Sequence, residues 1–192
     1  MDIMELLEGR RSIRKFQQDK PVPQEVVDKI LEAGRVASSA ANKQPLKFIV
    51  VQSSELVEQV FPLIKWAARL PEDQGTPKEG ERPVLYVVTL TDRSIKTNYA
   101  ATDAGLALSN MTLAAWSEGV GSCILGSVDR ATLRSLLEIS TGLQIHSVTA
   151  YGYPAISSHV VEAQDGDIGY YLDDDGNYCV PKRPLSETVT VL

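Results

Sequence analysis

The stretch NYAATDAGLALSNMTLAAWSE, residues 98–118, predicts the longest helix in the chain. Small and large apolar residues lie on nearly all of its sides, and a helix of that kind is usually buried against protein on most sides. Buried strands are predicted on either side of it, VLYVVTL (84–90) before it and SCILGSV (122–128) after it. We therefore expect other parts of the protein to cover this helix almost completely.

Outward from this centre, helices and strands alternate without tandem hairpins. Helices are expected at 2–9, 23–37 and 129–140, and strands at 47–52 and 145–154. A helix over 53–70 should be kinked or interrupted at Pro62, and the polar stretch 71–83 should be a loop. This order predicts an α+β fold in which helices flank a mixed central sheet. We expect residues 1–192 to form one domain, with 165–192 as a C-terminal arm.

Composition excludes several classes of protein. The chain has 192 residues, 43% of them hydrophobic, and a formal net charge of −6. An acidic chain of this kind lacks the basic face that a nucleic-acid binder needs, and no apolar run is long enough for a membrane span. Cys123 and Cys179 lie far apart, and neither His146 nor His159 has partners at metal-ligand spacing. We expect a cytoplasmic protein with two reduced thiols and no metal site.

A basic cluster near the start stands out against this acidic background. EGRRSIRKF (8–16) places Arg10, Arg11, Arg14 and Lys15 around Ser12. Arginine side chains and a hydroxyl are the groups that grip a phosphate. A second basic pair, Lys182 and Arg183, lies in VPKRP near the other end. From these residues alone two interpretations stay open: a phosphate held from both sides, or exposed cations that balance an acidic surface.

Two further stretches are unusual. SSAANKQP (38–45) leaves polar amides beside a buried strand, so Asn42 and Gln44 either tie down the loop or bind the polar edge of a ligand. GVGSCILGS (119–127) is rich in glycine but runs into a strand, which does not fit a dinucleotide-binding loop. Its main-chain amides at Leu125 and Gly126 could face a ligand, or the stretch could be only a tight turn.

Taken together, RRSIRKF, SSAANKQPLKFIVV and GVGSCILG resemble the FMN-dependent nitroreductase family. The resemblance runs from residue 2 to about 185, and VPKRP resembles the closing basic element of the family. It implies an intertwined homodimer of α+β subunits with two flavin sites at the interface.

The resemblance also implies roles for single residues. The phosphate and ribityl chain of FMN would be held by Arg10, Arg11, Ser12, Lys182 and Arg183. Arg14 would lie toward the pyrimidine edge of the flavin and tune it electronically. The other subunit would contribute Ser38, Ser39, Ala40 and Asn42, with Gln44 supporting their loop. The amides of Leu125 and Gly126 would face N5, and Lys65 and Lys78 are only candidates for a further flavin contact.

The activity implied by the resemblance needs no catalytic side chain, because the flavin carries the electrons. NADH or NADPH would donate hydride to N5, and a small flat electron-poor acceptor, such as a nitroaromatic or a quinone, would then be reduced in a ping-pong scheme. Two alternatives stay open: a different flavin reaction, such as reductive dehalogenation or flavin breakdown, and a protein that binds FMN without turnover.

Overall fold

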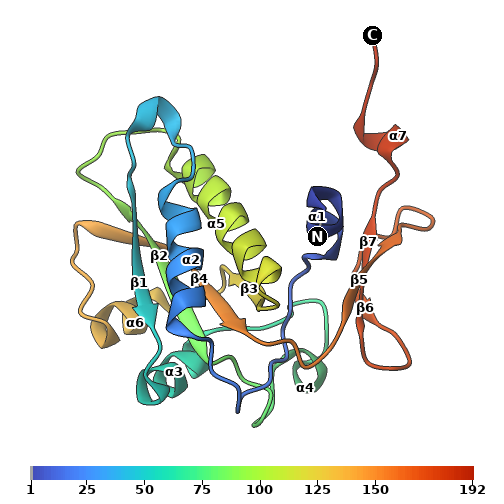
Figure 1. Ribbon diagram of the computed structural model, residues 1–192, viewed down its shortest axis with the longest axis horizontal. Coiled ribbons are helices and arrows are strands. Elements are labelled where there is room, and N and C mark those ends of the chain that lie inside the picture. Colours follow the sequence, from blue (N-terminus) through green and yellow to red (C-terminus); the bar gives the residue numbers. More distant parts are fainter. Residues whose placement is uncertain (1) are drawn as a thin grey trace.

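The computed structural model describes residues 2–192 and is built on a four-stranded sheet (Figure 1). The strands are β1 (Leu46–Val51), β2 (Leu85–Asp92), β3 (Gly121–Leu125) and β4 (Leu143–Gly152). Their order is β1-β2-β4-β3, and all neighbours are antiparallel. The parallel element of the sheet is a single bridge between Ser12 and Ser122 at the β3 edge. All four strands lie where the sequence predicts them.

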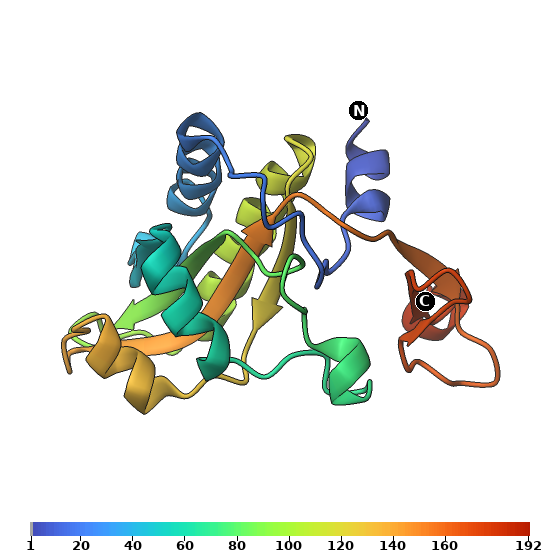
Figure 2. The same ribbon diagram turned by 90° about the horizontal axis from the view of Figure 1, so that it is seen from below.

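Helices cover both faces of this sheet (Figure 2). On one face, α2 (Gln24–Arg35) and α5 (Ala100–Ser117) pack together, and Ile30 and Met111 are fully buried in their core. On the other face lie α3 (Ser54–Val60) and α6 (Arg130–Leu136). The predicted helix over 53–70 stops after α3 and continues as the short 3-10 helix η2 (Phe61–Leu63), which contains Pro62.

The central helix α5 is only half covered within one chain. One side is buried from Asp103 to Ala115, as the sequence predicts. On the other side Leu106 is 45% exposed, and Tyr99, just before the helix, is 59% exposed. The neighbouring edge strand adds Ile124, which is 43% exposed. The expectation that protein covers α5 on most sides is therefore not met by this chain alone.

The C-terminal part forms a second, small sheet. It contains β5 (Ser158–Glu162), β6 (Tyr171–Leu172) and β7 (Tyr178–Lys182) in the order β5-β7-β6, followed by α7 (Leu185–Thr188). This sheet lies beside the first helix, α1 (Ile3–Gly9), and apart from the four-stranded sheet (Figures 1 and 2). The sequence indicates only an extended arm here, because strands of two to five residues separated by polar turns carry little periodicity.

Two short helices lie in segments that the sequence predicts as loops. They are α4 (Glu72–Gly75), within 71–83, and the 3-10 helix η1 (Ala40–Asn42), within SSAANKQP. In residues 2–192 no helix is both long enough and apolar enough to cross a membrane.

We expect Ile30→Ala to lower the free energy of unfolding by about 2–5 kcal/mol, because it leaves a cavity between α2 and the sheet. The matched control is Val36→Ala, just past the end of α2, where the side chain is exposed. It should change stability by no more than roughly 0.5 kcal/mol. Urea denaturation of both variants measures the difference, and equal effects would contradict this account of the core.

Candidate functional site

The basic segment predicted to bind a phosphate lies against the edge of the four-stranded sheet. The Ile13 N–H donates to the Ser122 carbonyl oxygen at 2.9 Å, and the Ile13 side chain is buried. Gly121 permits this close approach, because a Cβ there would lie 2.8 Å from Ile13. Since side chains alternate along an extended chain, burial of Ile13 directs its neighbours Ser12 and Arg14 away from that part of the core.

The cations of this segment are not equivalent. The Arg11 guanidinium donates to the carbonyl oxygens of Leu7 at 2.5 Å and Glu8 at 3.1 Å, so it caps the end of α1. Burial, and then the charge of Arg10, lower the pKa of Arg11. Lys15 forms an ion pair with Glu81 at 3.5 Å. Both side chains therefore already have partners within the protein.

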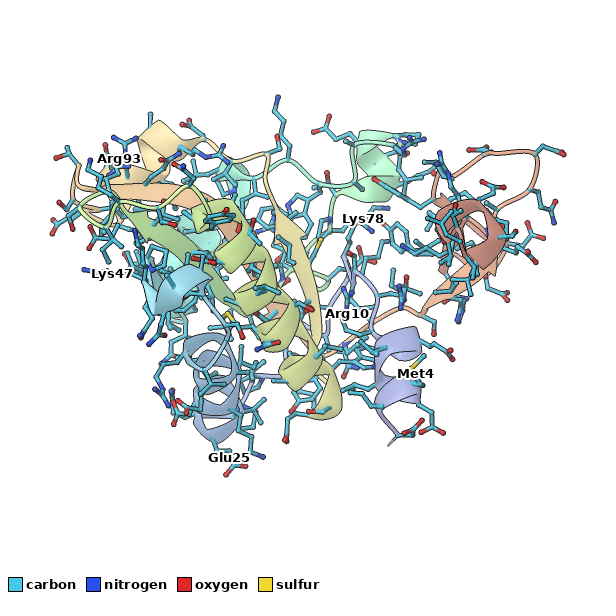
Figure 3. All side chains as sticks on the ribbon, turned by 90° about the horizontal axis from the view of Figure 1, so that it is seen from above. Met4, Arg10, Glu25, Lys47, Lys78 and Arg93 are labelled. Carbon is cyan, nitrogen blue, oxygen red and sulfur yellow. The ribbon has the colours of Figure 1, made fainter. Side chains whose placement is uncertain are left out.

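Arg10 differs from these two cations. Its Nε is buried and has no hydrogen-bond partner among residues 2–192. Figure 3 shows Arg10 between α1 and β3, close to the start of the segment that runs along the sheet. A buried guanidinium nitrogen without a partner is costly, so this position fits an anionic ligand such as a phosphate.

Arg14 lies over two aromatic rings of the C-terminal part, those of Tyr170, just before β6, and Tyr178, the first residue of β7. Its guanidinium carbon is 4.7 Å from the ring centroid of Tyr170 and 5.1 Å from that of Tyr178. Such cation–π contacts hold a guanidinium in one orientation. Burial raises the pKa of Tyr178, while the charge of Arg14 acts to lower it. The N-terminal basic segment and the C-terminal sheet are thus in direct contact, through residues that sequence spacing alone could not pair.

The second basic pair, Lys182 and Arg183, lies at the end of β7 that is far from Tyr178. Lys182 is the last residue of β7, and Tyr178 is the first. Four residues of strand span roughly 13 Å. Lys182 and Arg183 are exposed, and in the part of the chain that the structure describes they make no ion pair. β7 therefore connects Tyr178, which contacts Arg14, to the second basic pair. The strand does not by itself place Lys182 and Arg183 beside Ser12.

The SSAANKQP loop has an uncommon backbone. Ala41, Asn42 and Gln44 all have positive φ angles, of 50°, 52° and 49°. Left-handed backbone costs roughly 1–2 kcal/mol per residue for amino acids other than glycine, so the loop needs side-chain support. The Gln44 N–H donates to Ser39 Oγ at 3.0 Å, and Gln44 Nε2 donates to Asn42 Oδ1 at 3.0 Å. The two amides predicted here do tie down the loop.

A third support comes from α5. The Ala40 N–H donates to Asp103 Oδ1 at 2.9 Å, and Asp103 is only 1% exposed. Ser38, Ser39, Gln44 and Asp103 line a cavity of about 210 Å³ next to the loop. The sequence does not single out Asp103, since an acidic residue in the first turn of a helix is common.

The turn after β3 is also fixed from the side. Leu125 is buried, and the carbonyl oxygen of Gly126 accepts a hydrogen bond from Arg130 at 3.0 Å. Arg130 also donates to the carbonyl oxygens of Ile145 and His146, so it joins this turn to β4. The Lys65 N–H donates to the Ser127 carbonyl oxygen at 3.0 Å, which brings Lys65 beside the turn. Lys78 lies in the 71–83 segment, where its N–H donates to Glu81 (Figure 3).

Known proteins share this combination of fold and motifs. Residues 7–153 match the model of the Nitroreductase family. A relative from Methanothermobacter thermautotrophicus is 34% identical over 161 residues, which are 81% of this chain and 78% of the relative. Another from Archaeoglobus fulgidus is 31% identical over 170 residues, 85% of this chain and 92% of the relative. Both are provisionally named as an NADH dehydrogenase or NAD(P)H nitroreductase.

A solved structure agrees with these relatives. A provisionally named nitroreductase from Desulfovibrio desulfuricans, in complex with FMN, has a TM-score of 0.72 at 26% identity, over 100% of this chain and 97% of that one. The family model covers well over half of the chain, and two relatives above 30% identity align along most of their length. The chain therefore belongs to the nitroreductase family, a family of oxidoreductases.

Proposed function

We propose that the protein is an FMN-dependent NAD(P)H oxidoreductase that acts as a homodimer. The observation that carries this proposal is the buried, unpartnered Nε of Arg10, next to Ser12, on the segment bonded to β3. Family membership and the FMN-bound neighbour support FMN as the group that this site holds. When bound, FMN supplies the electron-transfer chemistry.

In this proposal the two ends of the chain hold the phosphate and ribityl chain. Arg10 and Ser12 supply a guanidinium and a hydroxyl, and Lys182 and Arg183 add charge from the end of β7. Arg11 belongs to the same set. Its Nε and one N–H of its Nη2 already cap α1, so Nη1 and the second N–H of Nη2 are left for a ligand. The capping bonds also fix the direction of the chain that leads to Ser12.

The isoalloxazine ring is oriented by three other parts of the protein. Arg14, held by its contacts with two tyrosine rings, would present a positive charge to the pyrimidine edge and would favour the negative charge that FMN gains there on reduction. The amides of Leu125 and Gly126 would face N5. The loop residues Ser38, Ser39, Ala40 and Asn42 come from the second subunit, with Gln44 supporting them. The three left-handed residues of that loop support this role, because strained loops held by several bonds are common at ligand sites.

A second copy of the chain also explains the uncovered side of α5. Leu106 on α5, Tyr99 just before α5 and Ile124 on the edge strand β3 are exposed apolar or aromatic side chains. Apolar and aromatic side chains of this kind are typical of the buried core of homodimer interfaces. The dimer would complete the burial that the sequence predicts for residues 98–118.

The reaction that we propose uses NADH or NADPH as hydride donor. A flat electron-poor acceptor, such as a nitroaromatic or a quinone, then occupies the same face of the flavin ring in a ping-pong scheme. The chain contributes by binding, orienting and polarising the cofactor, and no acid–base pair is required of it. The location of the enzyme is proposed to be cytoplasmic.

Purified protein should show a flavin absorption spectrum, or acquire one when FMN is added. Anaerobic NADPH or NADH should then bleach the long-wavelength flavin band, because hydride transfer reduces the ring. A protein that stays colourless in the presence of FMN would contradict the proposed function. Bound flavin that neither nicotinamide reduces would point to a binding protein instead.

The double variant Arg10→Ala/Ser12→Ala should bind FMN more weakly by roughly 1.5–3 kcal/mol, the contribution of hydrogen bonds to a charged group. Isothermal titration calorimetry measures the loss. The control is Arg93→Ala, an exposed arginine far from Arg10 in Figure 3, which should leave FMN affinity unchanged. Equal FMN affinity in the double variant and the wild type would show that the basic cluster is a set of exposed surface cations that does not bind the phosphate.

Leu106→Asp should convert the dimer into a monomer and lower FMN occupancy, because it puts a charge at the centre of the proposed interface. Sedimentation velocity measures the mass. The matched control is Ser135→Asp on α6, an exposed position on the opposite face of the sheet, which should stay dimeric. A monomeric wild type, or a dimeric Leu106→Asp variant, would rule out this interface.

A further inference from the structure

The SSAANKQP loop has a backbone conformation that costs conformational energy. Three of its residues have left-handed backbone, and none of the three is a glycine. Within the loop, Gln44 bonds to Ser39 and to Asn42, and the N–H groups of Asn42 and Lys43 donate to the carbonyl oxygens of Ser39 and Ala40. These bonds link parts of the loop to one another, but they do not fix the loop to the rest of the molecule.

Asp103 supplies one of three connections to the body of the protein, beside the bonds from Lys43 Nζ to the Lys96 carbonyl oxygen and from the Asp92 N–H to the Pro45 carbonyl oxygen. Asp103 lies in the first turn of α5, which packs against α2 and the sheet, and its Oδ1 accepts the Ala40 N–H at 2.9 Å. The bond reaches the loop directly before the left-handed residue Ala41. Since one partner is a carboxylate, the bond is stronger than a hydrogen bond between neutral groups.

The surroundings of Asp103 show that this carboxylate is held at a cost. The residue is 1% exposed, and its Oδ2 has no hydrogen-bond partner in the described residues. A buried charged oxygen without a partner is unfavourable. The positive end of the α5 dipole offsets part of that cost. The Asp103 side chain also lines the cavity of about 210 Å³ beside Ser38 and Ser39, so it faces the segment that we propose to contact the flavin.

We infer that Asp103 is a positioning residue, which locks the SSAANKQP loop in its left-handed conformation and so prepares it to contact FMN. The inference rests on the proposed function, because it takes this loop to be part of the cofactor site. Without the anchor the loop would occupy other conformations for part of the time. Apparent affinity then falls in proportion to the fraction of molecules that remain competent to bind.

Hydrogen exchange at the Ala40 amide tests the anchor directly, in the protein without cofactor. In Asp103→Ala this amide should exchange at least about tenfold faster than in the wild type, because it loses a bond to a charged acceptor. Asp103→Asn keeps an acceptor oxygen, so its Ala40 amide should exchange at a rate between those of the wild type and Asp103→Ala. Unchanged exchange in Asp103→Ala would overturn the anchor.

FMN affinity of the same variants tests the consequence. Asp103→Ala should bind FMN at least about tenfold more weakly, with partial or full recovery in Asp103→Asn. The matched control is Asp129→Ala. Asp129 also accepts two backbone N–H groups, from Ala131 and Thr132, but it caps α6 on the other face of the sheet. The Asp129→Ala variant should be less stable than the wild type, but its FMN affinity and the hydrogen exchange of its Ala40 amide should be unchanged.

The possible results separate this inference from the proposed function. If the wild type takes up no FMN, the proposed function fails, while exchange at Ala40 still decides whether Asp103 holds the loop. If the wild type binds FMN and Asp103→Ala binds it equally well, the inference fails and the proposed function stands. An Asp129→Ala variant that loses as much FMN as Asp103→Ala would also overturn it, since a general loss of stability would then explain both.

Discussion

The burial of Ile13 in the core fixes the position of the candidate site, because the nearby residues Arg10, Ser12 and Arg14 carry polar groups that cannot be buried with it. A β-branched apolar side chain gains free energy by leaving water, and the Ile13 N–H bond to Ser122 sets the register of the segment along β3. The absence of a side chain at Gly121 allows the two backbones to meet. Because polar and charged groups cannot follow Ile13 into the core, they line the edge of the sheet. The placement of the cations thus follows from apolar burial.

The rest of the candidate site is attached to the same frame from three directions. Arg11 caps α1 and so holds the start of the basic segment. Tyr170 and Tyr178 hold Arg14 from the C-terminal part. Asp103 and Arg130 hold the SSAANKQP loop and the turn after β3. In each case a charged side chain is bonded to backbone groups or lies over aromatic rings, which restricts movement more than an exposed ion pair does. The site residues are therefore largely pre-organised within one chain.

The sequence alone predicted the parts of the fold with strong periodicity. The four strands of the central sheet, α2 and α5 each show a clear apolar pattern and lie where it indicates. The small sheet was not predicted, because β6 has only two residues and β5 and β7 have five each. The functions of Arg11 and Asp103 were also not visible. Whether an arginine caps a helix, or an acidic residue reaches a distant loop, depends on contacts between elements that no local spacing encodes. The resemblance to the family was carried by short motifs, and the family model matches over residues 7–153.

We propose that Arg10 recognises the phosphate of the cofactor. Binding of FMN and of riboflavin can be compared to test this, because riboflavin has the same ring and ribityl chain without the phosphate. We expect the wild type to bind FMN much more tightly than riboflavin. Arg10→Ala should weaken FMN binding about tenfold or more and leave riboflavin binding almost unchanged, so that the preference shrinks. An Arg10→Ala variant that loses equal affinity for both ligands, or a wild type that binds both equally well, would contradict it.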